Sequence, residues 1–400
     1  MNITDSDLQL LSHGSPPSDN ELLASITVGR EKWLDHMRDH YLKAYIADGG
    51  SKVKVLTGKE GVGKTHLLYS VIADAKNLDY ATVFLSARKH RLNDLVSLYQ
   101  EIVNQIDQEG LVCGLCRKIA SQFIDLEQYD PSELFVSNLY DRYPSNSLAK
   151  DAIQKEVFKL IKSADLNSSF KAFCYHVLYN RMISFSASNV DIALDWLSGE
   201  NIDRKDRATL SLFDKLDKAN ARDWLNSLIQ LLKLSGKKGL VIAIDEIEVI
   251  TEKSPKTNRF IYTPLAVKDI CELIRQLIDD TEVLAHCLFL IAGDLVIIED
   301  PNRGFKSYDA LWLRLQTGLI EGDRFNAFAD LVNIDKHFAA INQDLAKDKK
   351  SFPTEVFKKL GSVLKAEKIS RDDYKFPDDF NQCTDLQQRV IEAVCSGKSK

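Results

Sequence analysis

The stretch that most constrains the fold of this chain is Gly58–Leu68, which reads GKEGVGKTHLL. The pattern G-x-x-x-x-G-K-[ST], typical of a phosphate-binding loop, is met by Gly58, Gly63, Lys64 and Thr65. Glycines let consecutive backbone N–H groups turn inward around phosphate oxygens, and the helix that follows adds the partial positive charge of its N-terminus. Such a loop requires a strand before it and a helix after it, so the stretch predicts an α/β fold.

The residues on either side of the loop agree with this requirement. Val53–Thr57 (VKVLT) is rich in β-formers, and His66–Ala75 has apolar residues at helical spacing. In this context Lys64 can reach the β- and γ-phosphates of a nucleotide, and the Thr65 hydroxyl can bind Mg²⁺. A glycine-rich turn that matches by chance is the alternative, and the flanking pattern argues against it. The predicted cofactor-binding residues of this stretch are Gly58, Glu60, Gly61, Val62, Gly63, Lys64, Thr65 and His66.

A second informative stretch is Gly239–Ile250, GLVIAIDEIEVI. Its continuous apolar part predicts a central strand of a parallel sheet that is covered on both faces, and it ends in Asp245 and Glu246. An acidic residue at such a strand end can hold Mg²⁺, and a following glutamate can orient the attacking water. Two solvated acids are the alternative, which the upstream loop disfavours. We therefore expect Asp245 to bind the metal together with Thr65 and Glu246 to be catalytic, whereas Glu248 is a poorer candidate because it lies beyond the strand end.

The composition is that of a chain with an ordinary core: 44% of the residues are hydrophobic, 28% are charged, and the net charge is −6. This mild acidity argues against a generally basic nucleic-acid-binding surface, although two local basic clusters exist, Arg88–Arg91 (RKHR) and Lys347–Lys350 (KDKK). For the first cluster, which follows a predicted strand, a ligand site and a solvated helix start remain equally open. The sequence has no long uninterrupted apolar window and no apolar signal region at its N-terminus, so neither a membrane span nor an export signal is expected.

The seven cysteines show no framework spacing, which predicts free thiols in a reducing cytoplasm. Cys113 and Cys116 form one C-x-x-C. A zinc site would need two further ligands, and none is nearby in the sequence, so core packing is favoured over metal or redox chemistry.

The chain between the two motifs reads as helix after helix. Lys64 and Asp245 lie roughly 180 residues apart, far more than one strand–helix–strand crossover requires. This predicts a helical subdomain inserted into the core. The predicted division is a polar N-terminal tail at 1–25, the first part of the core at 26–105, the helical insertion at 106–232, the second part of the core at 233–325 and a C-terminal helical lid at 326–400.

Three features together resemble the AAA+ ATPases of the origin-recognition type and the related signalling ATPases of the STAND type. They are VGRE before the loop, IDE at the end of a later strand, and the polar Asp294 at the end of the apolar strand after that. The resemblance implies a P-loop parallel-sheet AAA+-like core of α/β class. It also implies that Val28, Gly29 and Arg30 lie against the adenine and that Asp294 helps to place the attacking water.

The same resemblance implies that an arginine reaches the γ-phosphate of a neighbouring subunit, which makes the protein a homo-oligomer. Arg314 in LWLRL matches this place best, and Arg303 and Arg324 are rivals. An arginine in the lid is expected as well, for which Arg371 is a weak match. The resemblance does not extend to a winged-helix DNA-binding domain, because the chain has no room for one after residue 350.

A narrower resemblance rests on GGSKVKVLTGKEGVGKTHLL, ALDWLSGE and GLVIAIDEIEVI. These stretches look like the ATP-binding proteins of bacterial anti-phage defence islands, including the BREX type. The implied cofactors are ATP and Mg²⁺, and the implied partners are other defence proteins and double-stranded DNA, bound directly or through a partner. ATP hydrolysis would then remodel or load a partner. The alternative is a slow nucleotide-gated switch that docks partner proteins through the helical insertion.

Overall fold

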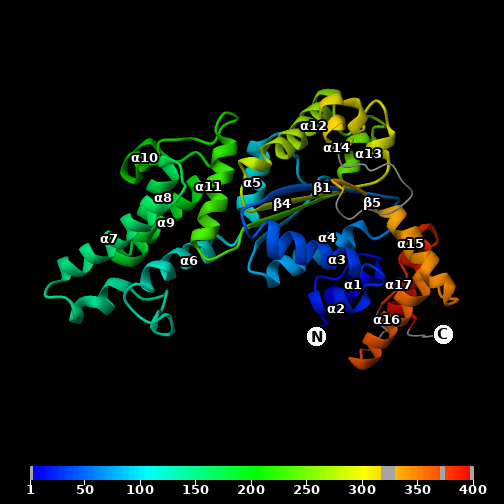
Figure 1. Cartoon of the computed structure of the whole chain (residues 1–400), viewed down its shortest axis with the longest axis horizontal. Helices are drawn as coiled ribbons and strands as arrows, with labels where there is room; N and C mark the ends of the chain where they lie inside the picture. Colours follow the sequence, from blue (N-terminus) through cyan, green and yellow to red (C-terminus); the bar gives the residue numbers. More distant parts are fainter. Residues whose placement is uncertain (1–2, 317–328, 370–373, 397–400) are drawn as a thin grey trace.

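The computed structural model describes residues 3–316, 329–369 and 374–396 of the 400-residue chain. A five-stranded sheet in the order β2-β3-β4-β1-β5 lies at its centre, with helices on both faces (Figure 1). All strand pairs are parallel, which confirms the predicted α/β class with a parallel sheet. The strands are β1 (Ser51–Thr57), β2 (Ala81–Ser86), β3 (Leu240–Asp245), β4 (Cys287–Gly293) and β5 (Leu331–Asn333).

The strands are apolar on both faces because helices cover both sides of the sheet. Every residue of β3 and β4 is buried. Leu288 and Leu290 of β4 pack into one hydrophobic cluster, whereas Phe289 and Ile291 pack into the other. The first cluster is covered by α3 (Glu31–His36), a π-helical segment (Met37–Tyr45) and α4 (Lys64–Asn77).

The register of the sheet brings the carboxyl ends of the strands together. Thr57 of β1 pairs with Gly293 of β4, and Ser86 of β2 pairs with Asp245 of β3. Ligands of open parallel sheets bind at this edge. The residues that follow four of the strands can therefore face one common site.

The other face of the sheet carries α12 (Pro264–Asp279), α13 (Val296–Glu299) and α14 (Asp309–Gln316), which lie above it in Figure 1. The chain between β2 and β3 forms α5 (Leu95–Gln105) and then a helical arm that projects to the left. The arm comprises α6 (Gln108–Ala120), α7 (Asn146–Ser163), α8 (Ser168–Tyr179), α9 (Ala187–Leu197), α10 (Arg204–Leu210) and α11 (Ala221–Leu234).

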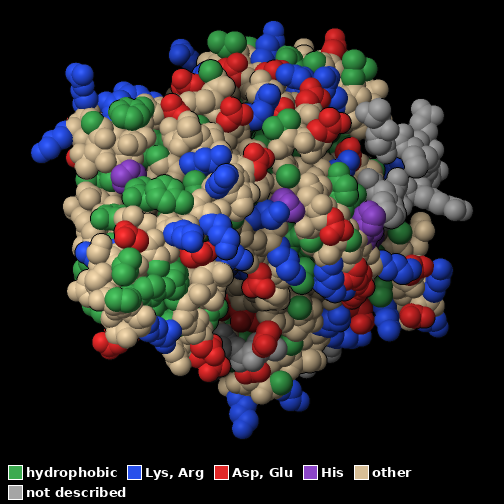
Figure 2. All heavy atoms as spheres, turned by 60° about the vertical axis from the view of Figure 1, so that its left-hand side comes forward, with side chains coloured by type: hydrophobic (Ala, Val, Ile, Leu, Met, Phe, Trp, Pro, Cys, Tyr) green, Lys and Arg blue, Asp and Glu red, His purple; other side chains and the backbone are tan. Residues whose placement is uncertain are grey.

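The arm shares its core with the sheet. Trp196 and Trp224 lie with ring centroids 4.5 Å apart, Phe170 packs edge-on against both, and Tyr99 of α5 contacts Trp224. All four belong to the same hydrophobic cluster as Ile242 in β3. On the face shown in Figure 2, where the arm comes forward, Lys and Arg side chains are interspersed with Asp and Glu side chains.

The C-terminal part, predicted to be helical from residue 326, contains a strand of the sheet ahead of its described helices. Leu331–Asn333 pairs with the end of β1, and three residues are too few to show a strand period in the sequence. The helices that follow are α15 (Ile334–Lys347), α16 (Phe352–Ala366) and α17 (Asp385–Cys395). Within the described ranges, no helix has both the length and the apolar content that crossing a bilayer requires.

The prediction of a polar tail at 1–25 is wrong. This segment forms α1 (Asp5–Ser12) and α2 (Asn20–Ile26), which pack against α16 and α17. The few apolar side chains of the segment, among them Leu8, Leu11 and Leu22, are buried in one cluster with Leu360 and Val394. Local composition is polar, but the apolar residues recur at helical spacing, and only the partner helices show what they cover.

Candidate functional site

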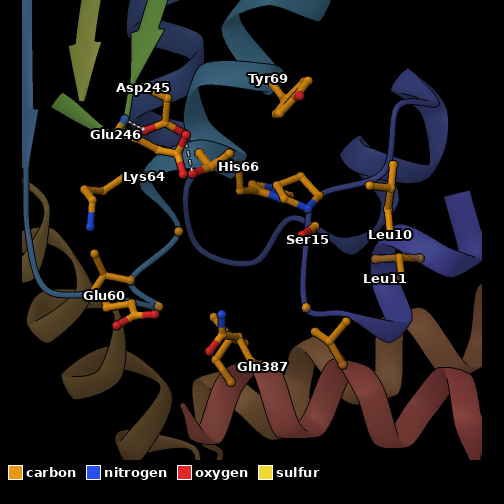
Figure 3. A pocket seen from close by; sticks show the side chains of 18 of the residues that line it. Leu10, Leu11, Ser15, Glu60, Lys64, His66, Tyr69, Asp245, Glu246 and Gln387 are labelled. Carbon is orange, nitrogen blue, oxygen red and sulfur yellow. Dashed lines mark hydrogen bonds between the residues drawn. The ribbon is translucent and has the colours of Figure 1, made fainter. Parts of the chain in front are cut away.

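A pocket with a volume of about 670 Å³ opens at the carboxyl ends of β1, β3 and β4 (Figure 3). Most of the predicted site residues line it. They are Val28, Arg30, Glu60, Gly61, Val62, Gly63, Lys64, Thr65, His66, Asp245, Glu246 and Asp294. Gly29, Gly58 and Arg314 are not part of its lining.

The loop between β1 and α4 has the backbone conformation that its glycines allow. Gly61 and Gly63 have φ values of 78° and 89°, in the left-handed region that other residues rarely adopt. Helix α4 begins at Lys64, directly after the loop, so its N-terminus faces the pocket. Backbone donors and the helix dipole together make this end of the pocket suitable for phosphate groups.

The ammonium group of Lys64 is buried in this end of the pocket. It donates hydrogen bonds to the carbonyl oxygens of Gly58 and Lys59, both at 2.9 Å, and forms an ion pair of 2.5 Å with Asp294 at the end of β4. Gly58 thus contacts the lysine rather than the pocket. Asp294 lies beside the group that would bind the terminal phosphates.

Thr65 and Asp245 form a pair of oxygen donors next to the loop. The Thr65 hydroxyl donates to the Asp245 carboxylate at 2.6 Å, and the Glu246 backbone N–H donates to the same carboxylate at 2.9 Å. Burial raises the pKa of Asp245, and the hydrogen bond from Thr65 opposes this shift. Mg²⁺ is commonly held by one or two protein oxygens together with substrate phosphates, and this pair fits that requirement.

Glu246 lies in a network of side chains that the sequence did not reveal. The residue adopts a left-handed backbone conformation with φ 60°, which is unusual for a non-glycine residue. Its carboxylate accepts hydrogen bonds from the Ser86 hydroxyl and from the Arg88 guanidinium. Arg88 also pairs with Glu248 at 3.2 Å and with Glu252 at 2.5 Å. The first basic cluster therefore contributes a site residue, because β2 and β3 are neighbours in the sheet.

Arg30 connects the phosphate loop to the C-terminal helices. Its buried guanidinium donates to the Val62 carbonyl at 2.6 Å, contacts His337 Nδ1 at 2.9 Å and lies 5.6 Å from the ring centre of Phe352. Burial lowers the pKa of Arg30 to about 10, and burial followed by the charge of Arg30 lowers that of His337 to about 3. Gly29 packs against α15, since an added Cβ would lie 2.6 Å from Ile341.

Apolar residues also line the pocket, and sequence reasoning missed them except for Val28. Leu10 and Leu11 of α1, with Ser15, lie on the side away from Lys64 (Figure 3), and Phe352 and Val356 of α16 and Val390 and Gln387 of α17 belong to the lining as well. These residues come from the two ends of the chain. No local pattern in the sequence marks them as neighbours.

The three candidate arginines have different surroundings. Arg314 of α14 forms an ion pair with Asp279 of α12 and donates to the Ala310 carbonyl at 2.7 Å. Arg303 is 7% exposed, lies against the Phe260 ring and donates to the Ile250 carbonyl at 3.1 Å. Such an interior position does not suit a group that must reach another subunit. Arg324 and Arg371 lie outside the described residues.

The cysteines and the second basic cluster do not add to the site. All seven cysteines are free, and burial raises the pKa of Cys116 to about 12. In the part of the chain that the structure describes, no group of three or more His, Cys, Asp and Glu side chains could hold a metal ion. In the second cluster, Lys347 forms an ion pair with Asp344 at 2.8 Å.

Comparison with known proteins supports the predicted resemblance. A family model described as BREX system ATP-binding protein BrxC/D matches residues 4–366. No curated protein matches the chain. Because the family match covers nearly all of the chain, the protein belongs to this family of BREX-type ATP-binding proteins.

Proposed function

We propose that this BREX-type protein is a Mg²⁺-dependent ATPase with an AAA+-like core. The observation that carries the proposal is the convergence of Lys64, Thr65, Asp245 and Glu246 in one pocket, although two of them lie far from the other two in the chain. In this proposal Lys64 binds the β- and γ-phosphates, Glu246 orients the attacking water, and Asp294 helps to place it. Thr65 and Asp245 hold Mg²⁺, which neutralises charge on the phosphate oxygens when it is bound.

The contacts that the arginines of the pocket already make suggest that a second subunit supplies the arginine for the γ-phosphate. Among the described residues that line it, the arginines are Arg30 and Arg88, but the first binds the Val62 carbonyl and the second binds three glutamates. Arg314 has a side chain that is 36% exposed on α14. We propose that it reaches the γ-phosphate of a neighbouring copy, so that turnover requires a homo-oligomer.

The biological role in this proposal is work on a partner within a phage-defence complex in the cytoplasm. In this proposal a partner protein binds the DNA, because one residue of each basic cluster is already paired with acidic groups: Arg88 with Glu246, Glu248 and Glu252, and Lys347 with Asp344. Hydrolysis then remodels or loads that partner.

The test is steady-state ATP hydrolysis across a protein concentration series, with Mg²⁺ or with EDTA, and with or without double-stranded DNA. The expected result is a rate per subunit that rises with concentration and that is lost with EDTA and in Lys64→Ala. An Arg314→Ala variant is expected to lower the rate of the assembled protein by about 10³–10⁵. A rate per subunit that is independent of concentration and of Arg314 would contradict the trans-acting arginine.

One observation favours a second candidate, a nucleotide-gated switch with slow hydrolysis. The Glu246 carboxylate is bound by Ser86 and Arg88 and must be released before it can orient water. A switch would bind ATP tightly and turn it over little until a partner docks, with the helical arm as the docking surface. Glu246→Gln separates the two candidates, since it abolishes the function of a motor but leaves partner binding by a switch intact.

A further inference from the structure

Residues 4–19 form a segment, here called the strap, that is closed by one buried carboxylate. Asp7 is 2% exposed. Its Oδ1 accepts hydrogen bonds from the Ser18 backbone N–H at 2.9 Å, the Ser18 hydroxyl at 2.7 Å and the Asp19 backbone N–H at 3.1 Å. Its Oδ2 accepts from the Thr4 backbone N–H at 3.1 Å and the Thr4 hydroxyl at 2.6 Å. One side chain therefore joins the start of α1 to the start of α2.

The closed strap is a wall of the pocket. Leu10, Leu11, Gly14, Ser15 and Pro16 line it, although Asp7 itself does not. Figure 3 shows Leu10, Leu11 and Ser15 on the side of the pocket away from Lys64 and Asp245. The loop after α1 is therefore placed by a residue that lies outside the pocket.

Helix α17 packs against the loop of the strap at Gly14. Gly14 has φ 71°, and an added Cβ there would lie 3.0 Å from Gln387 Cγ, so the loop rests directly on this helix. The same helix touches the phosphate loop, because a Cβ on Gly61 would lie 2.5 Å from Thr384. Strap, phosphate loop and α17 thus enclose one space between them.

The residue types at the end of the pocket formed by the strap and α17 suit a nucleobase. The phosphate groups are expected at the loop and Lys64, so the base of an elongated nucleotide must point toward the apolar end. Flat apolar rings bind well among aliphatic and aromatic side chains when a few polar groups fix their orientation. Gln387 is one such group: its Oε1 accepts hydrogen bonds from the Thr384 backbone N–H at 2.9 Å and hydroxyl at 3.0 Å, and its amide nitrogen points into the pocket (Figure 3).

We propose that the strap forms the wall of the base-binding end of the nucleotide site and that Asp7 is a positioning residue that holds this wall in place. The inference rests on the proposed function, since it assumes that the phosphates of a purine nucleotide occupy the loop. Leu10 and Leu11 contact the base. The hydrogen bonds of the Asp7 carboxylate fix the strap in the position in which these two leucines can make that contact.

The test measures binding of two probes to the full-length chain by calorimetry in the presence of Mg²⁺. ATP has a base, whereas tripolyphosphate has the phosphates alone. Leu10→Asp and Asp7→Ala are expected to weaken ATP binding about tenfold and to leave tripolyphosphate binding unchanged, because a burial or hydrogen-bond loss of this size corresponds to about 1.4 kcal/mol. Leu148→Asp on α7 is the matched control for the first variant, since Leu148 is also an exposed leucine on a helix.

Leu10 is 37% exposed, so its variant tests the proposal even if Asp7→Ala does not fold. Asp7→Asn should give an intermediate result, because its oxygen can still accept from Ser18 while its NH₂ group faces the Thr4 donors. Wild-type ATP affinity in Leu10→Asp, or equal weakening for both probes, would overturn the proposal. If the wild-type chain binds neither probe, the proposed nucleotide site itself fails.

Discussion

The two ends of the pocket are built by different rules. The end proposed to bind phosphate comes from one short loop and two strand ends, and each residue type there suits the proposed role: glycines for a left-handed turn, a lysine for phosphate, a hydroxyl and a carboxylate for a metal. The end proposed to bind the base comes from residues 10–28, 352–356 and 386–390, far apart in the chain, and needs only apolar side chains of suitable shape. Recognition of a charged ligand group therefore requires a pattern that is visible in the sequence, whereas recognition of an apolar ring by shape does not.

The two ends also differ in charge. At the phosphate end two cationic groups are already paired, Lys64 with Asp294 and Arg88 with three glutamates. At the base end the strap is organised by one ionised group outside the pocket, Asp7. Variants at the first end should thus act on turnover or on binding of the phosphates, and variants at the second on affinity for the base.

Within the pocket, the largest effect is expected at Lys64. Removing its ammonium group in Lys64→Ala takes away a charged donor to the transferring phosphate, which corresponds to a loss of about 10³ in turnover. Binding of both ATP and tripolyphosphate should fall, since the lysine contacts phosphate rather than base. Lys76→Ala, at the exposed end of the same helix, is the control. If Lys64→Ala lost its affinity for ATP but kept its affinity for tripolyphosphate, the lysine would contact the base and not the phosphates.

Glu246→Gln should separate binding from chemistry within the phosphate end. The amide keeps the shape but cannot take a proton from water, so turnover should fall about 10² or more while the affinity for ATP stays unchanged. Single-turnover hydrolysis and nucleotide binding, measured side by side, check this. Unchanged hydrolysis would move the catalytic role to Glu248, whose pKa is raised by burial.

Acid should affect the base end through Asp7. Burial by itself would raise the pKa of Asp7, but hydrogen bonds from Thr4 and Ser18 lower it to about 2, below the ordinary value of 3.8. The folded state thus favours the ionised form, and its contribution is complete above pH 4 and is lost as the pH falls toward 2. The free energy of unfolding should decrease by up to about 2 kcal/mol over this window. Thermal unfolding of Asp7→Asn, compared with wild type at each pH, should lack this part of the decrease.

The smallest effect is expected at Arg88. The arginine and Glu246 are both 39% exposed, and an ion pair of this kind contributes up to about 1 kcal/mol. Arg88→Gln should release Glu246 and raise basal hydrolysis by up to about fivefold. Arg91→Gln, in the same cluster, is the control. Slower hydrolysis in Arg88→Gln would show that the arginine supports catalysis instead of restraining the carboxylate.

The sequence by itself determined the α/β class, the parallel sheet, the long helical connection and the two motifs whose residues meet in the pocket. Each of these depends on local patterns: the glycine spacing of the loop, the unbroken apolar run before Asp245, and helical periodicity in the arm. A strand that is buried on both faces requires an unbroken apolar run, and a loop that turns its backbone N–H groups around phosphate requires glycines.

Only the tertiary structure decided the rest. It brings Arg88 to Glu246 because β2 pairs with β3, and it places Arg303 in the interior against Phe260. It turns a polar N-terminal segment into a wall of the pocket, since Leu8 and Leu11 are buried only where α16 and α17 meet them. Contacts between distant segments depend on how the helices pack, and the side chains that make them are ordinary apolar residues whose partners cannot be read from their neighbours in the chain.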